Sequence, residues 1–218
     1  MKKTKKSLLA IVALSAVCIS AQFVIACGDD SPTPTKSDSE IFTSAISQLT
    51  NYSANVSYKH PSYAPFNTDV KVDNNTFHMF VHDDPLSFNS HYEVFAKEEN
   101  GKLQVYENKY LNKNDNPLMS SSGWYTASKY DNPFDATKNY TCYVNMFAKL
   151  KYEDVTKNNE WYVVNATACS KYYADLNSCK IQLDGETVVK AIANIEDEHL
   201  EITYTFSNIG TTQITLPD

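Results

Sequence analysis

The sequence predicts an α+β domain whose main element is an antiparallel β-sheet. Short runs in which apolar and polar residues alternate recur from residue 51 to the carboxyl end, as expected of strands with one buried face. Turns rich in Asn, Asp and Gly separate these runs, which is typical of hairpins. Two other segments, 37–51 and 135–151, carry apolar residues at helical spacing. Hairpin-linked strands with two helices indicate an α+β fold in one domain.

The amino-terminal segment is predicted to be an export signal. Lysines at positions 2, 3, 5 and 6 precede an apolar run from Leu8 to Ala26, which is the layout of a secretory signal. The run is also long enough to be an uncleaved transmembrane helix. The sequence Val24-Ile25-Ala26-Cys27-Gly28 resembles the lipobox of bacterial lipoproteins and favours the first interpretation. The resemblance implies that residues 1–26 are removed and that diacylglycerol on the Cys27 thiol holds the protein on the outer face of the cell membrane.

A polar segment follows Cys27. Residues 28–40 contain no apolar residue except proline, so they cannot bury a core. We therefore expect 27–39 to be the lipidated cysteine with a disordered tether, and 40–218 to be a single folded domain. Fully extended, such a tether reaches on the order of 40 Å, which is enough to lift the domain clear of the lipid headgroups.

The first helix is predicted to begin at a capping box. Ser37 is placed as the N-cap and Glu40 as the third helical residue. The helix should end near Asn51, where the alternating pattern begins. Its apolar face is expected to consist of Ile41, Phe42, Ala45, Ile46 and Leu49.

Strands and one more helix are predicted along the rest of the chain. The second helix is placed within 135–151, where Tyr140, Val144 and Phe147 share a face, and 108–122 is predicted to be a surface loop. The predicted turns lie at 73–75, 99–101, 184–185, 196–198 and 208–210. The strands are centred on 54–58, 70–72, 77–81, 92–96, 103–105, 124–125, 161–166, 181–183, 187–195, 200–206 and 214–216.

This order of elements resembles a known superfamily. An amino-terminal helix, a strand of the type Tyr52-Ser53-Ala54-Asn55-Val56-Ser57 and a closing pair of strands joined at 208–210 are similar to lipoprotein-localisation factors and lipid-carrying envelope lipoproteins. The resemblance implies a curved antiparallel sheet, an unclosed half-barrel, wrapped around about two helices over an apolar cavity. The residues expected to line such a cavity are Ile41, Ala45, Leu49, Ile202, Tyr204, Ile214 and Leu216.

Histidines form the candidate metal site. His78 and His82 fall on one face of a predicted strand, opposite Phe77 and Val81, so both could face water and a divalent ion. The acidic pair Asp83 and Asp84 and a third histidine, His91, are close in sequence. Zinc needs three or four converging ligands, and nothing in the sequence brings His91 to the other two. Solvated histidines on the outer face are the alternative, and no metal or other cofactor is assigned.

Cysteines allow one internal disulfide. Cys142, Cys169 and Cys179 remain after cleavage, and the outside of a cell permits disulfides. Cys169 and Cys179 flank one polar connection and are the expected pair. Three reduced, half-buried thiols are the alternative.

Charge and motifs exclude several functions. The 26 acidic residues face 15 lysines once the four lysines of the signal are set aside, and the chain has no arginine. The resulting net charge of −11 argues against nucleic-acid binding and against electrostatic adhesion to anionic lipid. No nucleophile motif such as Gly-x-Ser-x-Gly is present, so no catalytic residue is assigned and the protein is expected not to be an enzyme.

Two functional hypotheses follow. The first is a non-enzymatic envelope lipoprotein that binds or carries a lipid or another apolar ligand in its half-barrel. The second is a surface interaction module that binds a protein or glycan through loops and exposed aromatic residues, with the sheet as a filled scaffold. An open cavity on the concave face would favour the first hypothesis, and a packed core would favour the second.

Overall fold

The computed structural model describes residues 36–84, 90–110, 117, 119–120, 123–127, 144–172, 176–195 and 199–218. These belong to one compact unit, Lys36–Asp218. The predicted signal peptide and residues 27–35 of the predicted tether lie outside the described residues. No helix within the described ranges is long and apolar enough to span a bilayer.

The described residues form helices at the start and in the second half of the unit, with strands between and around them. The helices are α1 (Asp38–Ser47), α2 (Val144–Lys149) and α3 (Ala166–Tyr172), with a 3-10 turn at Tyr152–Asp154. The strands are β1 (Asn51–His60), β2 (Tyr63–Asp73), β3 (Thr76–Asp84), β4 (Ser90–Glu99), β5 (Lys102–Tyr110), β6 (Met119–Ser120), β7 (Tyr125–Thr126), β8 (Val155–Asn158), β9 (Trp161–Val164), β10 (Leu176–Asp184), β11 (Thr187–Ile195) and β12 (Leu200–Ser207).

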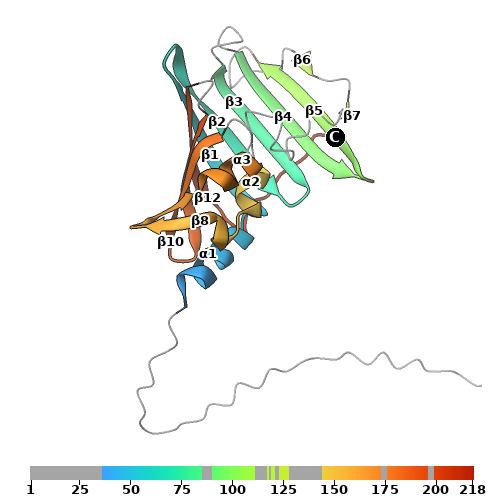
Figure 1. Ribbon diagram of the computed structural model, residues 1–218. Coiled ribbons are helices and arrows are strands. Elements are labelled where there is room, and N and C mark those ends of the chain that lie inside the picture. Colours follow the sequence, from blue (N-terminus) through green and yellow to red (C-terminus); the bar gives the residue numbers. More distant parts are fainter. Residues whose placement is uncertain are drawn as a thin grey trace, which may run out of the picture. The chain divides into compact units, whose positions relative to one another are not determined.

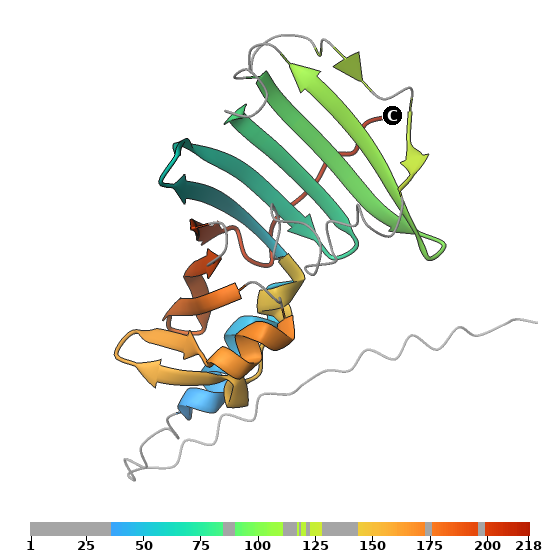
Figure 2. The same ribbon diagram turned by 45° about the horizontal axis from the view of Figure 1, so that its top comes forward.

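The twelve strands in the described part of the chain belong to one open sheet. Its order is β6-β5-β4-β3-β2-β1-β12-β11-β10-β9-β8, with β7 paired to β5. The two end strands, β6 and β8, do not pair with each other, so the sheet does not close. Figures 1 and 2 show that the sheet bends strongly between the β2–β5 part and the β8–β12 part, and that the helices lie beside the latter. The predicted class, an unclosed and curved antiparallel sheet with a few helices, is confirmed.

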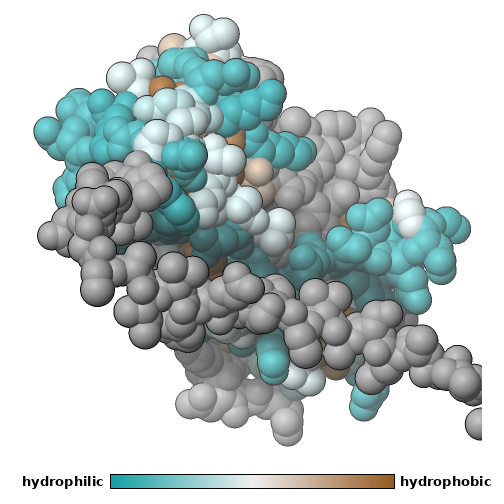
Figure 3. Space-filling view, turned by 90° about the horizontal axis from the view of Figure 1, so that it is seen from below, coloured by the Kyte–Doolittle hydropathy of each residue, from teal (hydrophilic) through white to brown (hydrophobic). Residues whose placement is uncertain are grey.

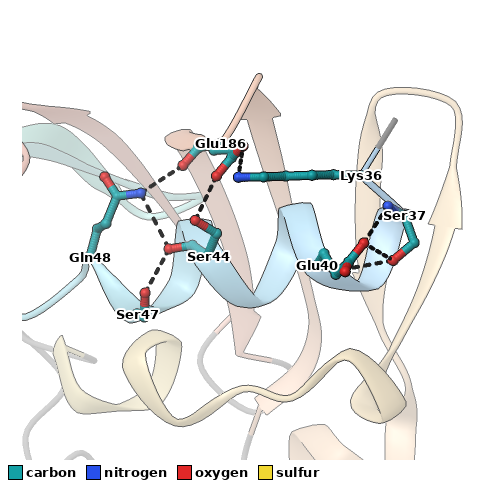
Figure 4. Close-up of polar contacts among 7 residues, drawn as sticks. All are labelled: Lys36, Ser37, Glu40, Ser44, Ser47, Gln48 and Glu186. Atoms are coloured by element: carbon teal, nitrogen blue, oxygen red, sulfur yellow. Dashed lines mark hydrogen bonds and ion pairs between the residues drawn. The ribbon is translucent and has the colours of Figure 1, made fainter. Parts of the chain in front are cut away.

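Helix α1 begins at the predicted capping box. The backbone N–H of Ser37 donates to Glu40 Oε2 at 2.7 Å, and the backbone N–H of Glu40 donates to Ser37 Oγ at 3.3 Å. Figure 4 shows that Glu186, in the turn between β10 and β11, then fixes the helix to the sheet. Its carboxylate accepts from Lys36 Nζ at 2.5 Å and from Ser44 Oγ at 2.7 Å. The helix is therefore held at its first turn and again one turn from its end.

The helices and the second half of the sheet share one apolar core. Phe42 of α1 is fully buried, with its ring 4.9 Å from that of Tyr162 on β9. Phe147 of α2 is buried edge-on against Tyr204 of β12, with the ring centroids 5.0 Å apart. Burying each such side chain contributes about 1.5–3 kcal/mol, so this core stabilises both helices on the sheet.

The outer surface is largely polar where it is described. In the view of Figure 3, hydrophilic and intermediate residues cover most of the coloured surface, and apolar residues show only in small patches. Among the large apolar side chains of the described ranges, Tyr125 is exposed. The loops with several exposed aromatic residues that the second hypothesis invoked are not seen in this part of the chain.

Three local predictions were wrong. Residues 211–218 form no strand, although one was expected at 214–216. Strand β12 is already paired on both edges, by β1 and by β11, so the segment that follows it finds no free edge there. The strand expected at 161–166 stops at Val164, because the side chain of Asn165 accepts from the backbone N–H of Ala168 at 2.8 Å and starts α3. Part of the surface loop expected at 108–122 is strand, since β5 continues to Tyr110.

The predicted second helix is described only in part. Helix α2 covers Val144–Lys149, inside the expected range of 135–151, and residues 135–143 lie outside the described residues.

Candidate functional site

Strands β2–β5 have one apolar face and one polar, aromatic face. Buried on the first are Val70, Val72, Phe77, Met79, Val81, Val94, Ala96, Leu103 and Val105. The second, here called the histidine face, carries Asp69, His78, Phe80, His82, His91, Glu93, Phe95, Tyr106, Asn108 and Tyr110. Alternation places each set on its own side of the sheet. The strand registers then put Phe80 directly opposite both Asp69 and Glu93, and Glu93 directly opposite Asn108.

The Glu93 carboxylate is the centre of the hydrogen bonds on this face. His78 Nε2 lies 2.8 Å from Oε1. Asn108 Nδ2 and the hydroxyl of Tyr110 both donate to Oε2, at 3.0 and 2.5 Å. The side chains of His78 and Glu93 are only 14% and 15% exposed. Three strands thus hold one largely buried carboxylate in a single orientation.

These contacts change the acidity of two groups. Burial raises the pKa of Glu93, but hydrogen bonds from His78, Tyr110 and Asn108 outweigh burial and lower the pKa to about 2. Burial, together with the hydrogen bond to Glu93 and its charge, raises the pKa of Tyr110 to about 12. At neutral pH, Glu93 is therefore an anion and Tyr110 a neutral hydrogen-bond donor.

Aromatic rings surround Phe80 on the same face. Its ring lies 4.8 Å from that of His82, 5.8 Å from that of His91 and 5.9 Å from that of Tyr110. His82 Nε2 is also 2.6 Å from a carboxylate oxygen of Asp69. Phe80 itself is partly exposed. The result is a small aromatic platform with fixed polar groups on both sides.

Asn108 carries a hydrogen-bonding atom that the protein does not use. Its side chain must point its Nδ2 toward Glu93, because a carboxylate only accepts hydrogen bonds. Its Oδ1 then has no hydrogen-bond partner within the described part of the chain, although Asn108 is only 8% exposed. Leaving a buried acceptor unpaired costs roughly 1–3 kcal/mol, and this oxygen is covered by other atoms of the protein, so a donor from outside does not reach it in this conformation.

The carboxyl-terminal segment covers another part of the histidine face. The backbone oxygen of Thr212 accepts a hydrogen bond from Asn51 Nδ2 at 2.9 Å. The hydroxyl of Thr212 lies 2.9 Å from the hydroxyl of Ser53, which is on the side of β1 that continues the histidine face. At the far side, the indole N–H of Trp124 donates to the backbone oxygen of Pro217 at 3.3 Å. In Figure 2 the segment crosses the strands and ends near β5 and β7. We call residues 211–218 the C-terminal strap.

The side chains predicted to line a cavity divide into two groups. Ala45, Leu49, Ile202 and Tyr204 are at most 1% exposed and belong to the core that the helices share with the sheet, and Ile41 is partly exposed. Ile214 and Leu216 instead lie in the C-terminal strap and are also partly exposed. The four core residues are thus close together in space, whereas Ile214 and Leu216 belong to a different part of the structure.

The candidate metal site takes a different form from the one expected. His78 and His82 do share a face, and His91 joins them, with its ring 6.3 Å from that of His82. However, His78 pairs with Glu93 and His82 with Asp69. Among the described residues no three His, Cys, Asp or Glu side chains converge as metal ligands. The side chains of Asp83 and Asp84, which belonged to the expected site, lie outside the described part of the structure.

Cys169 and Cys179 are neighbours in the core. Both are buried thiols. Cys179 of β10 pairs with Val164 of β9, and Cys169 Sγ of α3 lies 3.9 Å from the backbone oxygen of the same Val164. Burial raises the pKa of each thiol, and for Cys179 the charge of Cys169 adds to this effect. Cys142 lies outside the described residues.

Sequence reasoning missed Glu93, Asn108 and Tyr110 as partners of the histidines. The pairing of Glu93 with Asn108 could have been predicted from the turn that joins their strands. The turn at Asn100-Gly101 fixes the pairing of Glu99 with Lys102, and counting back along both strands places Glu93 opposite Asn108. The pairing of β3 with β4 could not be counted in this way, because it shifts register between Val81 and Asp84.

Comparisons with known proteins give a weak likeness in structure. No family model matches the sequence, and no curated protein matches it either. A solved structure of a DUF1329 family protein from Desulfovibrio piger aligns with 78% of this chain and 90% of its own, at 11% sequence identity and a TM-score of 0.27. At such values the likeness carries no inference about function.

Proposed function

We propose that the protein is a non-enzymatic lipoprotein of the cell envelope that binds a partner through its histidine face. The lipobox-like sequence ending at Cys27 supports anchoring by lipid on the outer face of the cell membrane. The polar tether supports a domain that stands away from the bilayer. The folded unit, Lys36–Asp218, has its own core and can act at that distance.

The observation that carries this proposal is the fixed polar network around Glu93. Polar side chains on the outward face of a sheet are usually solvated and mobile. Here three donors from β3 and β5 hold one carboxylate that is 15% exposed, beside a partly exposed aromatic ring, Phe80. Rigid aromatic and polar groups are what a recognition surface needs, because little side-chain entropy is lost when a partner binds.

The same network supports a role without catalysis. A general acid or base works best when its pKa lies near the working pH. Glu93 has a pKa of about 2, and Tyr110 has one of about 12, so neither exchanges a proton readily near neutral pH. The donors around Glu93 suit binding better than proton transfer.

Binding at this face is favoured over carriage of a lipid inside the half-barrel. The predicted lining residues Ala45, Leu49, Ile202 and Tyr204 are at most 1% exposed, and Phe147 covers the ring of Tyr204. An acyl chain needs a pocket of roughly 300 Å³ or more, and these side chains are occupied with each other. Lipid carriage remains the competing outcome in the experiment below.

Two measurements on purified Lys36–Asp218 test the proposal. In co-sedimentation with envelope fragments of the host, we expect the wild-type unit to be retained and Phe80→Ala to be retained less. Phe66→Ala is the matched control, because Phe66 lies on the opposite face of β2, stacked 4.5 Å from Tyr58. Native mass spectrometry of the unit from cells should show no bound lipid. Lipid adducts, or equal retention of Phe80→Ala and wild type, would contradict the proposal.

A further inference from the structure

A straight row of side chains runs across the histidine face from β1 to β5. The strand registers align its members, which are Ser53, Lys71, His78, Phe95 and Tyr106. The ring of Trp124 extends the row beyond β5, because it lies 5.8 Å from that of Tyr106. We call these six residues the cross-strand row. It runs beside Phe80, since His78 and Phe80 are two residues apart on β3, which is about 7 Å.

The C-terminal strap lies along this row. Thr212 attaches one end of the strap to β1, and Pro217 attaches the other end to Trp124. Five steps of extended chain cover about 17 Å. The four strand spacings from β1 to β5 amount to about 19 Å. The strap therefore runs nearly straight and crosswise over β2, β3 and β4, as Figure 2 shows. Residues 212, 214 and 216 are more buried than 211, 213 and 215, as expected when alternate side chains face the sheet.

The attachments recognise a peptide backbone more than particular side chains. Asn51 acts like a neighbouring strand, because its Oδ1 accepts from the backbone N–H of Thr212 at 2.7 Å and its Nδ2 donates to the backbone oxygen of Thr212 at 2.9 Å. The indole N–H of Trp124 likewise donates to a backbone oxygen, that of Pro217. The contact between the hydroxyls of Thr212 and Ser53 adds one side-chain interaction. Every polypeptide carries these backbone groups, so another extended segment can form the same bonds.

The strap is held weakly between its two attachments. Within the described part of the chain, residues 213–216 form no hydrogen bonds, and Ile214 and Leu216 stay partly exposed. The pairings among β1 to β5 are formed without the strap. Segments with few hydrogen bonds and little buried apolar surface open at a low free energy. The strap can therefore leave while the strands beneath it stay paired.

We propose that the cross-strand row is a docking surface for an extended peptide segment of a partner protein, and that the C-terminal strap occupies this surface until the partner replaces it. This inference rests on the proposed function and names the chemical class of the partner. The partner's backbone takes over the hydrogen bonds of Asn51 and Trp124. The strap is then an autoinhibitory contact, which competes as a tethered ligand at an effective concentration in the millimolar range.

Isothermal titration with a synthetic peptide of residues 211–218 tests the inference. The receptor is Lys36–Gly210, which lacks the strap, and intact Lys36–Asp218 is the control. We expect the peptide to bind the truncated unit with a Kd between about 1 μM and 1 mM, and to bind the intact unit about tenfold or more weakly. In the truncated unit, Ser53→Ala should weaken binding roughly fivefold. Ser57→Ala, on the same face of β1, should leave it unchanged.

A second pair of variants leaves the strap in place. In the intact unit, Thr212→Ala loosens the strap without changing the surface beneath it, so the peptide should bind up to about fivefold more tightly than to wild type. Thr215→Ala is the matched control, because Thr215 lies on the exposed side of the strap and should have no effect. Circular dichroism establishes that each variant is folded. If the truncated unit does not fold, this pair decides the test.

Each outcome separates the docking surface from the broader function. No heat of binding to the folded truncated unit at millimolar peptide would overturn the inference. Equal binding to the truncated and intact units, or equal effects of Thr212→Ala and Thr215→Ala, would overturn it as well. If the peptide does not bind but the intact unit sediments with envelope fragments through Phe80, the proposed function stands without the inference. If the peptide binds and no unit is retained by envelope fragments, the docking surface stands and the proposed function is wrong.

Discussion

Replacing Glu93 with glutamine should destabilise the folded unit by about 3 kcal/mol at pH 7. Glutamine has nearly the same shape but no charge, and it offers one acceptor oxygen and one donor group. The carboxylate now accepts from three donors, at 2.8, 3.0 and 2.5 Å. Hydrogen bonds to a charged group contribute about 1 kcal/mol more than neutral ones, so losing the charge on three of them costs about 3 kcal/mol.

The lowered pKa of Glu93 expresses the effect of the same hydrogen bonds and gives a similar magnitude. Its pKa falls from 4.5 to about 2 on folding, and each unit is equivalent to about 1.4 kcal/mol, which amounts to about 3 kcal/mol. Because the folded-state value is the lower one, this stabilisation is complete above pH 4.5 and is lost as the pH falls toward 2. Wild type should therefore lose more stability than Glu93→Gln across that range, and the two should converge near pH 2.

Urea denaturation of Lys36–Asp218 followed by tryptophan fluorescence, from pH 7 down to pH 2, measures this effect. At pH 7 the melting temperature of Glu93→Gln should also fall by roughly 6–12 °C. Glu153→Gln is the control, since Glu153 pairs with Lys151 at 3.6 Å but its side chain is 73% exposed, and it should change stability by less than about 0.5 kcal/mol. If Glu93→Gln is as stable as the control at pH 7, the network does not stabilise the fold and our reasoning about the histidine face is wrong.

Three further predictions concern the anchor, the core and the cysteines. Cys27→Ala should leave an uncleaved precursor that is not labelled by radioactive fatty acid, and persistent labelling would refute lipid attachment at that residue. Tyr204→Ala should cost about 3–5 kcal/mol in urea denaturation, because Tyr204 is 1% exposed, while the exposed neighbour Thr205→Ala should stay within about 0.5 kcal/mol. Cys169 and Cys179, which are buried thiols with raised pKa, should resist alkylation in the folded unit and should both react once the unit is unfolded in urea without reductant; a tryptic crosslink between them would refute this prediction.

The elements that the sequence predicts well are those decided by local physics. The capping box at Ser37 and Glu40 needs only four residues and is present as expected. Alternation likewise identified the buried faces of β1 and β12, because each buried residue there is two positions from the next. The strand that was wrongly expected at 214–216 shows what local sequence cannot predict. Its sequence alternates, but whether it pairs depends on the edges of β12, and both are taken by strands from distant parts of the chain.

The candidate site was predicted only within single strands. His78 and His82 could be placed on one face, since that follows from the period of the strand. Their partners come from β2 and β4, and those contacts depend on which strands are adjacent and in which register. A bulge after Val81 changes that register by an amount that no turn sequence specifies. The contacts between β3 and β4 could therefore not be derived from the sequence, whereas the pairing of Glu93 with Asn108 could be counted from the turn at Asn100-Gly101.

The pairing of β1 with β12 has a consequence for how the chain matures. These strands form the middle of the sheet, yet Ala54 and its partner Phe206 come from opposite ends of the folded unit. Contacts so distant in sequence form late, because nearly the whole chain must be ordered before they are gained. If the chain is exported amino end first, as proposed, β1 would pair with β2 early, but its other edge would stay unpaired until β12 had emerged. Truncation after β11 should therefore leave an exposed edge on β1 and an aggregating chain instead of a smaller sheet.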